Sequence, residues 1–99
     1  MAKATPESKV KAKVITMLDL VGAYRFSPQS GIYGRSGIPD IVGCYHGRFF
    51  AVECKAGTNK PTALQEKELA KIREAGGLAV WVNEQTLDKH IMEILQCKF

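Results

Sequence analysis

Three charged side chains stand inside the apolar strand-like segments on either side of His46-Gly47. Asp40 lies near the start of the first segment, and Glu53 and Lys55 lie at the end of the second. A two-residue turn at His46-Gly47 would place Asp40 opposite Glu53. Side chains alternate along a strand, so Lys55 projects to the same side as Glu53. The spacing therefore predicts that the three charged groups converge at one end of a hairpin.

Two carboxylates in that position need a compensating charge. At a separation of about 5 Å and an effective dielectric constant of about 20, they repel by about 3 kcal/mol. A surface ion pair with Lys55 returns at most about 1 kcal/mol. Mg²⁺ or Mn²⁺ would relieve the repulsion better, because both prefer oxygen ligands. The alternative is that Asp40, which follows Pro39, belongs to a turn, and that Glu53 and Lys55 end an exposed strand.

Glu7 and Gln65 each allow two interpretations. Glu7 stands three residues before Val10 and continues the apolar stripe of a predicted helix. It is either a first-turn acid favoured by the helix dipole or a site residue. Gln65 stands three residues after Thr62, as in a capping box, and its helix face also carries Leu69. For Gln65 the capping role and a role in a site are compatible.

Hydrophobic spacing and turn signals predict the order α-β-β-β-α-β-α. The unit running from the third strand through a helix to the fourth strand allows those two strands to be parallel, whereas the earlier hairpin is antiparallel. We therefore expect one mixed sheet with helices packed on it. The predicted segments are a helix over 6–21 after the cap Thr5, strands over 23–28, 38–45 and 48–55, a helix between Thr62 and residues 76–77, a strand over 78–83, and a helix capped by Thr86.

The bulk properties are those of a globular protein. The 99 residues predict a single domain over 1–99, and a net charge of +4 permits an anionic partner. Cys44, Cys54 and Cys97 are odd in number and lack C-x-x-C spacing, so we expect buried free thiols in a reducing cytoplasm rather than disulfides or zinc. The sequence shows no signal peptide and no membrane-spanning segment, so we expect a cytoplasmic protein.

The sequence as a whole resembles a known family of nucleases. Pro39-Asp40, the run Glu53-Cys54-Lys55, and Gln65 resemble the PD-(D/E)xK signature. With Glu7, the loop GRSGIPDIVG and Gly47-Arg48, residues 5 to 83 resemble the virus-type replication-repair nuclease (VRR-NUC) family. The resemblance implies a restriction-endonuclease-like α-β-β-β-α-β core, an α/β fold in which helices flank a mixed sheet. It also implies hydrolysis of phosphodiester bonds with Mg²⁺, for which Mn²⁺ would substitute.

The resemblance implies a role for each matching residue. Asp40 and Glu53 would bind the metal, the backbone carbonyl of Cys54 would complete the metal site, and Glu7 would be a direct or water-mediated ligand. Lys55 would orient or help deprotonate the attacking water and offset phosphate charge. The helix residue Gln65 would lie near that lysine and the scissile phosphate. Contacts to the DNA backbone would come from four cations: Arg35, Lys9, Lys13 and Lys60.

Members of the family that consist of the nuclease alone resemble phage and bacterial proteins that resolve four-way DNA junctions as homodimers. A twofold dimer presents two sites, which suits a two-fold branched substrate. We expect the last helix and its tail, residues 94–99, to form part of the dimer surface. The alternatives are a nuclease for flaps or splayed arms, a non-catalytic basic DNA-binding module, and a structural protein whose charged strand end is only surface.

Overall fold

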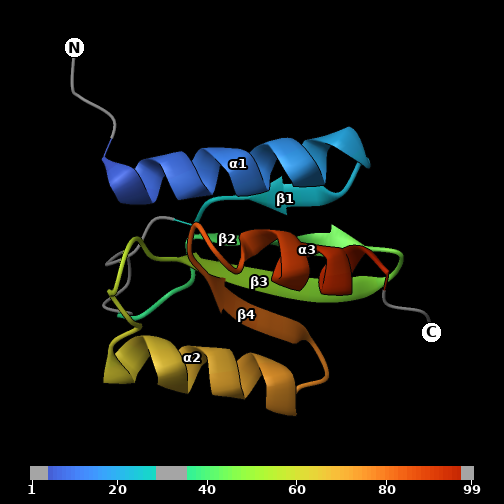
Figure 1. Ribbon diagram of the computed structural model, residues 1–99. Coiled ribbons are helices and arrows are strands. Elements are labelled where there is room, and N and C mark those ends of the chain that lie inside the picture. The colour runs from blue at the N-terminus through green and yellow to red at the C-terminus, as the bar shows by residue number, and fades with distance from the viewer. Residues whose placement is uncertain (1–4, 29–35, 97–99) are drawn as a thin grey trace.

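A computed structural model describes residues 5–28 and 36–96 (Figure 1). The predicted α/β fold and its order of elements, α-β-β-β-α-β-α, are confirmed. The first two helices each end about one residue earlier than predicted, and the first strand keeps three residues of the six expected. The elements are α1 (Pro6–Leu20), β1 (Tyr24–Phe26), β2 (Ile41–Tyr45), β3 (Arg48–Cys54), α2 (Ala63–Glu74), β4 (Leu78–Val82) and α3 (Leu87–Leu95).

The four strands form one mixed sheet in the order β1-β2-β3-β4. β2 and β3 run antiparallel and β3 and β4 run parallel, as the sequence predicts, and β1 runs antiparallel to β2. The hairpin register is also as predicted, since Tyr45 pairs with Arg48 and Val42 with Ala51. His46 and Gly47 both have positive φ, at 49° and 82°. Two such residues are the requirement of the type I′ turn that best fits a two-residue hairpin.

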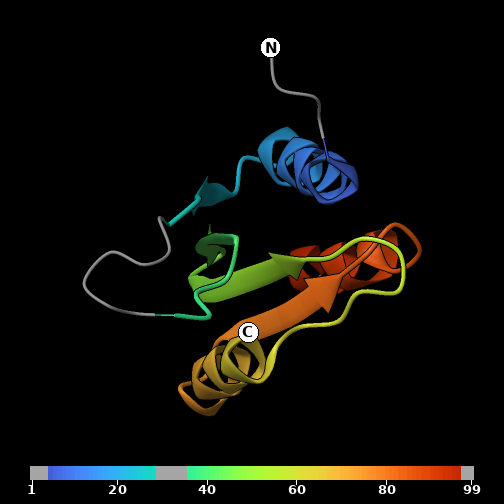
Figure 2. The same cartoon turned by 90° about the vertical axis from the view of Figure 1, so that its left-hand side faces the viewer.

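Helices cover both faces of the sheet, α1 and α3 one face and α2 the other (Figure 2). Alternate residues of β3 therefore enter two separate clusters. Phe50, Val52 and Cys54 pack with the stripes of α1 and α3, whereas Ala51 packs with Leu69 of α2. Because β3 is central, both of its faces are buried over its C-terminal half. Any polar residue on that part of the strand is consequently removed from water.

Two helices begin as the sequence predicts. The hydroxyl of Thr5 accepts a hydrogen bond from the backbone N–H of Ser8, and Thr62 forms the predicted capping box. Thr86 occupies the predicted N-cap position before α3, but its side chain makes no capping hydrogen bond. Thr86 has helical backbone angles, and its hydroxyl accepts a hydrogen bond from the backbone N–H of Asn83 instead of capping α3. A cap needs an extended residue, and Thr86 is not extended.

The expectation of buried thiols is wrong for Cys44. Cys54 is buried and Cys44 is exposed, and both are free. Cys44 lies on the face of the sheet that α2 packs against, but α2 covers β3 and β4 and leaves that part of β2 open. Cys97 lies outside the described residues. Within the described ranges, no helix combines the length and the apolar character needed to cross a membrane.

Gly43 lets β1 approach β2. A Cβ atom at this position would overlap the backbone carbonyl oxygen of Tyr24 and lie 2.8 Å from the ring of Phe50. We expect Gly43→Ala to lower Tm by about 10 °C or more, because overpacking costs about 1–3 kcal/mol and each kcal/mol shifts a domain of this size by about 4–8 °C. Thermal unfolding followed by circular dichroism measures this. The control Cys44→Ala, at an exposed neighbour, should leave Tm almost unchanged, and an equal fall in both variants would contradict the steric argument.

Candidate metal centre

Three carboxylates from separate elements converge at one end of the sheet. Glu7 lies in the first turn of α1, Asp40 immediately precedes β2, and Glu53 lies near the end of β3. Each offers one oxygen, and these oxygens all lie within 4.8 Å of one another. The structure thus brings together the three acidic residues that the sequence singled out as metal ligands.

Asp40 is held by a backbone hydrogen bond rather than by the strand ladder. The last β2–β3 pair is Ile41 with Val52, so Asp40 forms a bend one residue before the ladder. Its Oδ2 accepts a hydrogen bond of 2.8 Å from the backbone N–H of Cys54. This bond fixes the carboxylate beside the end of β3. The sequence predicted the proximity of Asp40 to Glu53 but not the bond that sets it.

Glu53 is almost fully buried, with 2% of its surface exposed. Its Oε2 accepts a hydrogen bond of 2.9 Å from Nε2 of Gln65 and lies 3.5 Å from Nζ of Lys55. Its Oε1 is buried without a hydrogen-bond partner. Burial and the negative charge of Asp40 raise the pKa of Glu53 to about 7, although Lys55 opposes the rise. An unpartnered carboxylate oxygen of this kind carries a large desolvation cost unless something binds it.

Gln65 performs the capping role and contacts the site at the same time. Its Oε1 accepts from the backbone N–H of Thr62, and its own backbone N–H donates to the Thr62 hydroxyl. These bonds leave Nε2 free to donate to Glu53. Both interpretations of Gln65 therefore describe the same side chain. Through Gln65, the first turn of α2 therefore orients the carboxylate of Glu53.

Lys55 follows β3 directly and is held by the neighbouring strand. Its backbone N–H donates to the carbonyl of Val82 at 2.8 Å, and 12% of its side chain is exposed. The next residue but one, Gly57, donates its backbone N–H to both carboxylate oxygens of Glu84, at 2.9 and 3.1 Å. Glu84 therefore anchors the segment that carries Lys55. No spacing in the sequence signals this contact, because it joins two loops far apart in the chain.

The thiol of Cys54 does not belong to the carboxylate cluster. It points into the core shared by α1 and α3. Burial, followed by the charges of Asp40 and Glu53, raises its pKa to about 12. A protonated, buried thiol is a poor ligand and a poor nucleophile. Only backbone groups of Cys54 can serve the site, and its predicted carbonyl ligand stays a prediction.

The residues present fit a hard divalent cation. All three convergent groups are carboxylates, which are the ligands that Mg²⁺ and Mn²⁺ prefer. Glu53, which joins Glu7 and Asp40 in this cluster, also carries the buried oxygen without a hydrogen-bond partner, Oε1. A cation between the carboxylates would remove both the like-charge repulsion and the unmet hydrogen-bonding capacity.

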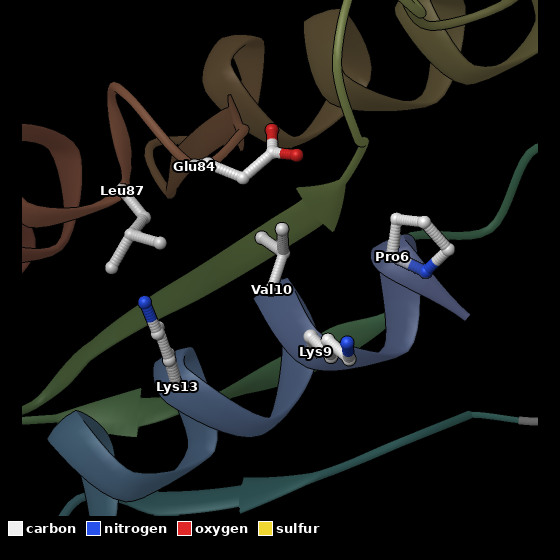
Figure 3. Close-up of a pocket in the computed structure, with 6 residues that line it drawn as sticks. All are labelled: Pro6, Lys9, Val10, Lys13, Glu84 and Leu87. Carbon is white, nitrogen blue, oxygen red and sulfur yellow. The ribbon is translucent and has the colours of Figure 1, made fainter. Parts of the chain in front are cut away.

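Several cations that the sequence singled out lie outside this cluster. Lys9 and Lys13 are exposed on α1, and they line a surface pocket with Glu84 on its other side (Figure 3). Hydrogen bonds from its own backbone N–H and from Gly57 hold the pKa of Glu84 below its usual value, and the charge of Lys13 acts in the same direction. Lys60 is exposed in the segment before α2, and Arg35 lies outside the described residues.

Known proteins are similar to this chain in sequence and in fold. No protein-family model matches the chain. A protein of Acyrthosiphon pisum secondary endosymbiont phage 1, named "Putative nuclease p44", is 33% identical over 85 residues, covering 82% of this chain and 86% of that protein. A solved structure named "VRR_NUC domain" matches with a TM-score of 0.74 and 26% identity over 90% of this chain and 97% of its own. A second, named "VRR_NUC domain protein", has a TM-score of 0.66 and 19% identity over 93% and 87%, and at that identity it supports the fold alone.

Proposed function

The chain belongs to the VRR-NUC family, and on that premise we propose that it is a metal-dependent, structure-selective DNA endonuclease that resolves four-way junctions as a homodimer. One observation carries the proposal. Glu7, Asp40 and Glu53 each offer one carboxylate oxygen within 4.8 Å of the others, Oε1 of Glu53 is buried without a partner, and Lys55 and Gln65 contact Oε2 of the same carboxylate. Neither a structural surface nor a simple DNA-binding module needs that costly arrangement.

Each residue of the cluster has a distinct task in this proposal. Glu7, Asp40 and Glu53 would hold Mg²⁺, and the backbone carbonyl of Cys54 would add a ligand. When bound, the ion polarises the scissile phosphate and lowers the pKa of a coordinated water. Lys55 would orient the attacking water and place positive charge where negative charge develops on the phosphate.

The neighbouring hydrogen bonds keep the ligands in place. Gln65 holds Oε2 of Glu53, which leaves Oε1 directed away from that bond. The backbone N–H of Cys54 holds Asp40 in the same way. Ligands fixed before binding lose little conformational freedom when the ion arrives.

The DNA would be bound through its backbone. Lys9 and Lys13 project from α1, which also carries Glu7, and Lys60 precedes the helix that carries Gln65. With Arg35 they would supply salt-dependent attraction to phosphates without reading sequence. We place the protein, a single domain over residues 1–99, in the cytoplasm of a bacterial or phage-infected cell.

A cleavage assay on a panel of labelled DNAs tests the proposal. The panel holds a four-way junction, a flap, a splayed arm and a linear duplex, each with Mg²⁺, with Mn²⁺ and with a chelator. We expect both metals to support cutting, the junction to be cut fastest, and the chelator to abolish cutting. Preference for the flap or splayed arm would overturn the junction assignment. DNA binding without any cleavage would overturn the enzymatic function.

A further inference from the structure

The edge of the sheet formed by β1 carries an exposed apolar surface. Four side chains of residues 20–26 are exposed, at 80% for Leu20, 43% for Val21, 69% for Tyr24 and 49% for Phe26. We call these four residues the edge patch. Tyr24 and Phe26 lie edge to face, with ring centroids 6.3 Å apart. Exposed apolar side chains gathered in one short stretch of the chain are a candidate interaction surface.

The charge of this edge argues for a protein partner rather than DNA. Arg25 is the one charged residue of the stretch 20–26. Its guanidinium makes two hydrogen bonds, of 2.9 and 2.8 Å, to the carboxylate of Asp19. The edge is therefore close to neutral, whereas a surface that binds DNA backbone needs uncompensated cations.

We propose that the edge patch is the homodimer interface, where β1 of one copy pairs antiparallel with β1 of a second copy about a twofold axis through Arg25. This inference rests on the proposed function for the need of two sites. β1 is the end strand of the sheet, so its outer side has no strand partner among the described residues. An unpaired edge strand is a ready template for another strand.

The symmetric register gives complementary contacts. With Arg25 on the axis, Tyr24 of each copy faces Phe26 of the other on one face of the sheet, as an aromatic cross-strand pair. The two Arg25 side chains meet on the opposite face, where Asp19 of the same copy already neutralises each one. The pairing therefore brings apolar groups together without setting uncompensated charges against each other.

The area is consistent with a modest dimer interface. An aromatic side chain offers about 150–250 Å² of surface. At their exposed fractions, Tyr24 and Phe26 together present about 240 Å² per copy. This is about a third of the roughly 800 Å² per partner in a stable interface, before Leu20 and Val21 are counted.

The arrangement would also orient the two catalytic sites. Through the strand registers, Tyr24 and Phe26 share a sheet face with Ala51, and therefore with Glu53 two residues further along β3. A twofold axis perpendicular to the joined sheet keeps both Glu53 residues on that same face. Five strand spacings separate the two β3 strands, which is about 24 Å across the sheet. Two sites on one face can act on one branched DNA.

Sedimentation equilibrium of the full chain and its variants tests the interface. We expect the wild type to have twice the protomer mass of 10.9 kDa and Tyr24→Glu with Phe26→Glu to have the protomer mass, with an unchanged circular dichroism spectrum. Tyr24→Glu alone, at the more exposed position, should weaken the dimer in the same direction. Tyr24→Glu with Phe26→Lys should restore the dimer, because the register sets opposite charges against each other. The edge patch thus replaces the dimer surface expected at the last helix and its tail, of which residues 97–99 lie outside the described residues. The control Met92→Glu, an exposed apolar residue of α3, should therefore remain dimeric.

Three results would overturn the interface. They are a monomeric wild type, a dimer that survives Tyr24→Glu with Phe26→Glu, and a dimer that Met92→Glu dissociates, which would place the interface on α3. Cleavage assays on the same samples separate this inference from the proposed function. A monomeric wild type that cuts DNA would contradict the proposed interface and support the nuclease activity. A dimer that forms through β1 but does not cut any DNA of the panel would contradict the nuclease activity and support the proposed interface.

Discussion

Lys55→Met is expected to lower the rate of DNA cleavage by about 10²–10³-fold, the cost of removing one group that stabilises developing charge. The metal-induced rise in Tm should remain, because Glu7, Asp40 and Glu53 are unchanged. Lys55 lies 3.5 Å from Oε2 of Glu53, so its ammonium group is beside the carboxylate cluster without belonging to it. Methionine replaces the apolar stem and removes the charge alone.

Single-turnover cleavage of the junction and thermal unfolding with and without Mg²⁺ measure the two effects. Lys89→Met is the matched control, since Lys89 is exposed on α3 and should lose neither cleavage nor stability. Cleavage by Lys55→Met at the rate of the wild type would remove the catalytic role. Loss of the metal-induced rise would show that Lys55 helps to build the metal site instead.

The hairpin was predictable because its determinants are local. His46-Gly47 allows positive φ at both turn positions, and histidine tolerates that conformation better than β-branched residues do. The turn fixes the register, and the register places Asp40 and Glu53 at the same end of the sheet. Sequence reasoning could therefore nominate both carboxylates before any tertiary contact was known.

Two features that the sequence did not predict, the exposure of Cys44 and the contact made by Glu84, depend on contacts between distant segments. Cys44 is exposed because α2 covers only half of a sheet face, and no pattern around residue 44 encodes the placement of α2. The contact of Glu84 could not be predicted from the sequence, because its partner, Gly57, belongs to another loop. The failure at Thr86 is local, because the backbone N–H of Asn83, three residues earlier, donates to the hydroxyl that was expected to cap the helix.

The burial of Glu53 is expected to cost stability in the metal-free protein. In the absence of metal its pKa of about 7 lies above the ordinary value of 4.5. Between those two pH values the folded state binds more protons than the unfolded state, so stability falls as pH rises through this window. Below about pH 4.5 the penalty is absent, and above about pH 7 it is fully present. At about 1.4 kcal/mol per pKa unit, the penalty amounts to about 3 kcal/mol at most.

Glu53→Gln should therefore stabilise the metal-free protein at pH 8 while it abolishes metal-dependent cleavage. The amide keeps an oxygen to accept from Gln65 and adds an N–H group that can donate to Asp40 or Glu7. We expect Tm in chelator to rise by about 5–15 °C at pH 8, from about 1–3 kcal/mol, and to change little at pH 4.5. Thermal unfolding across this pH range measures the difference.

Mg²⁺ supplies the second half of this test. It should raise the Tm of the wild type at pH 8, because an ion that binds only the folded state stabilises it, and it should leave Glu53→Gln unmoved. The isosteric control Gln85→Glu, at an exposed loop position, should respond to neither pH nor metal in this way. If Glu53→Gln were less stable than the wild type at pH 8 without metal, the buried carboxylate would stabilise the fold instead of destabilising it. The charge cluster would then need no ion to explain it.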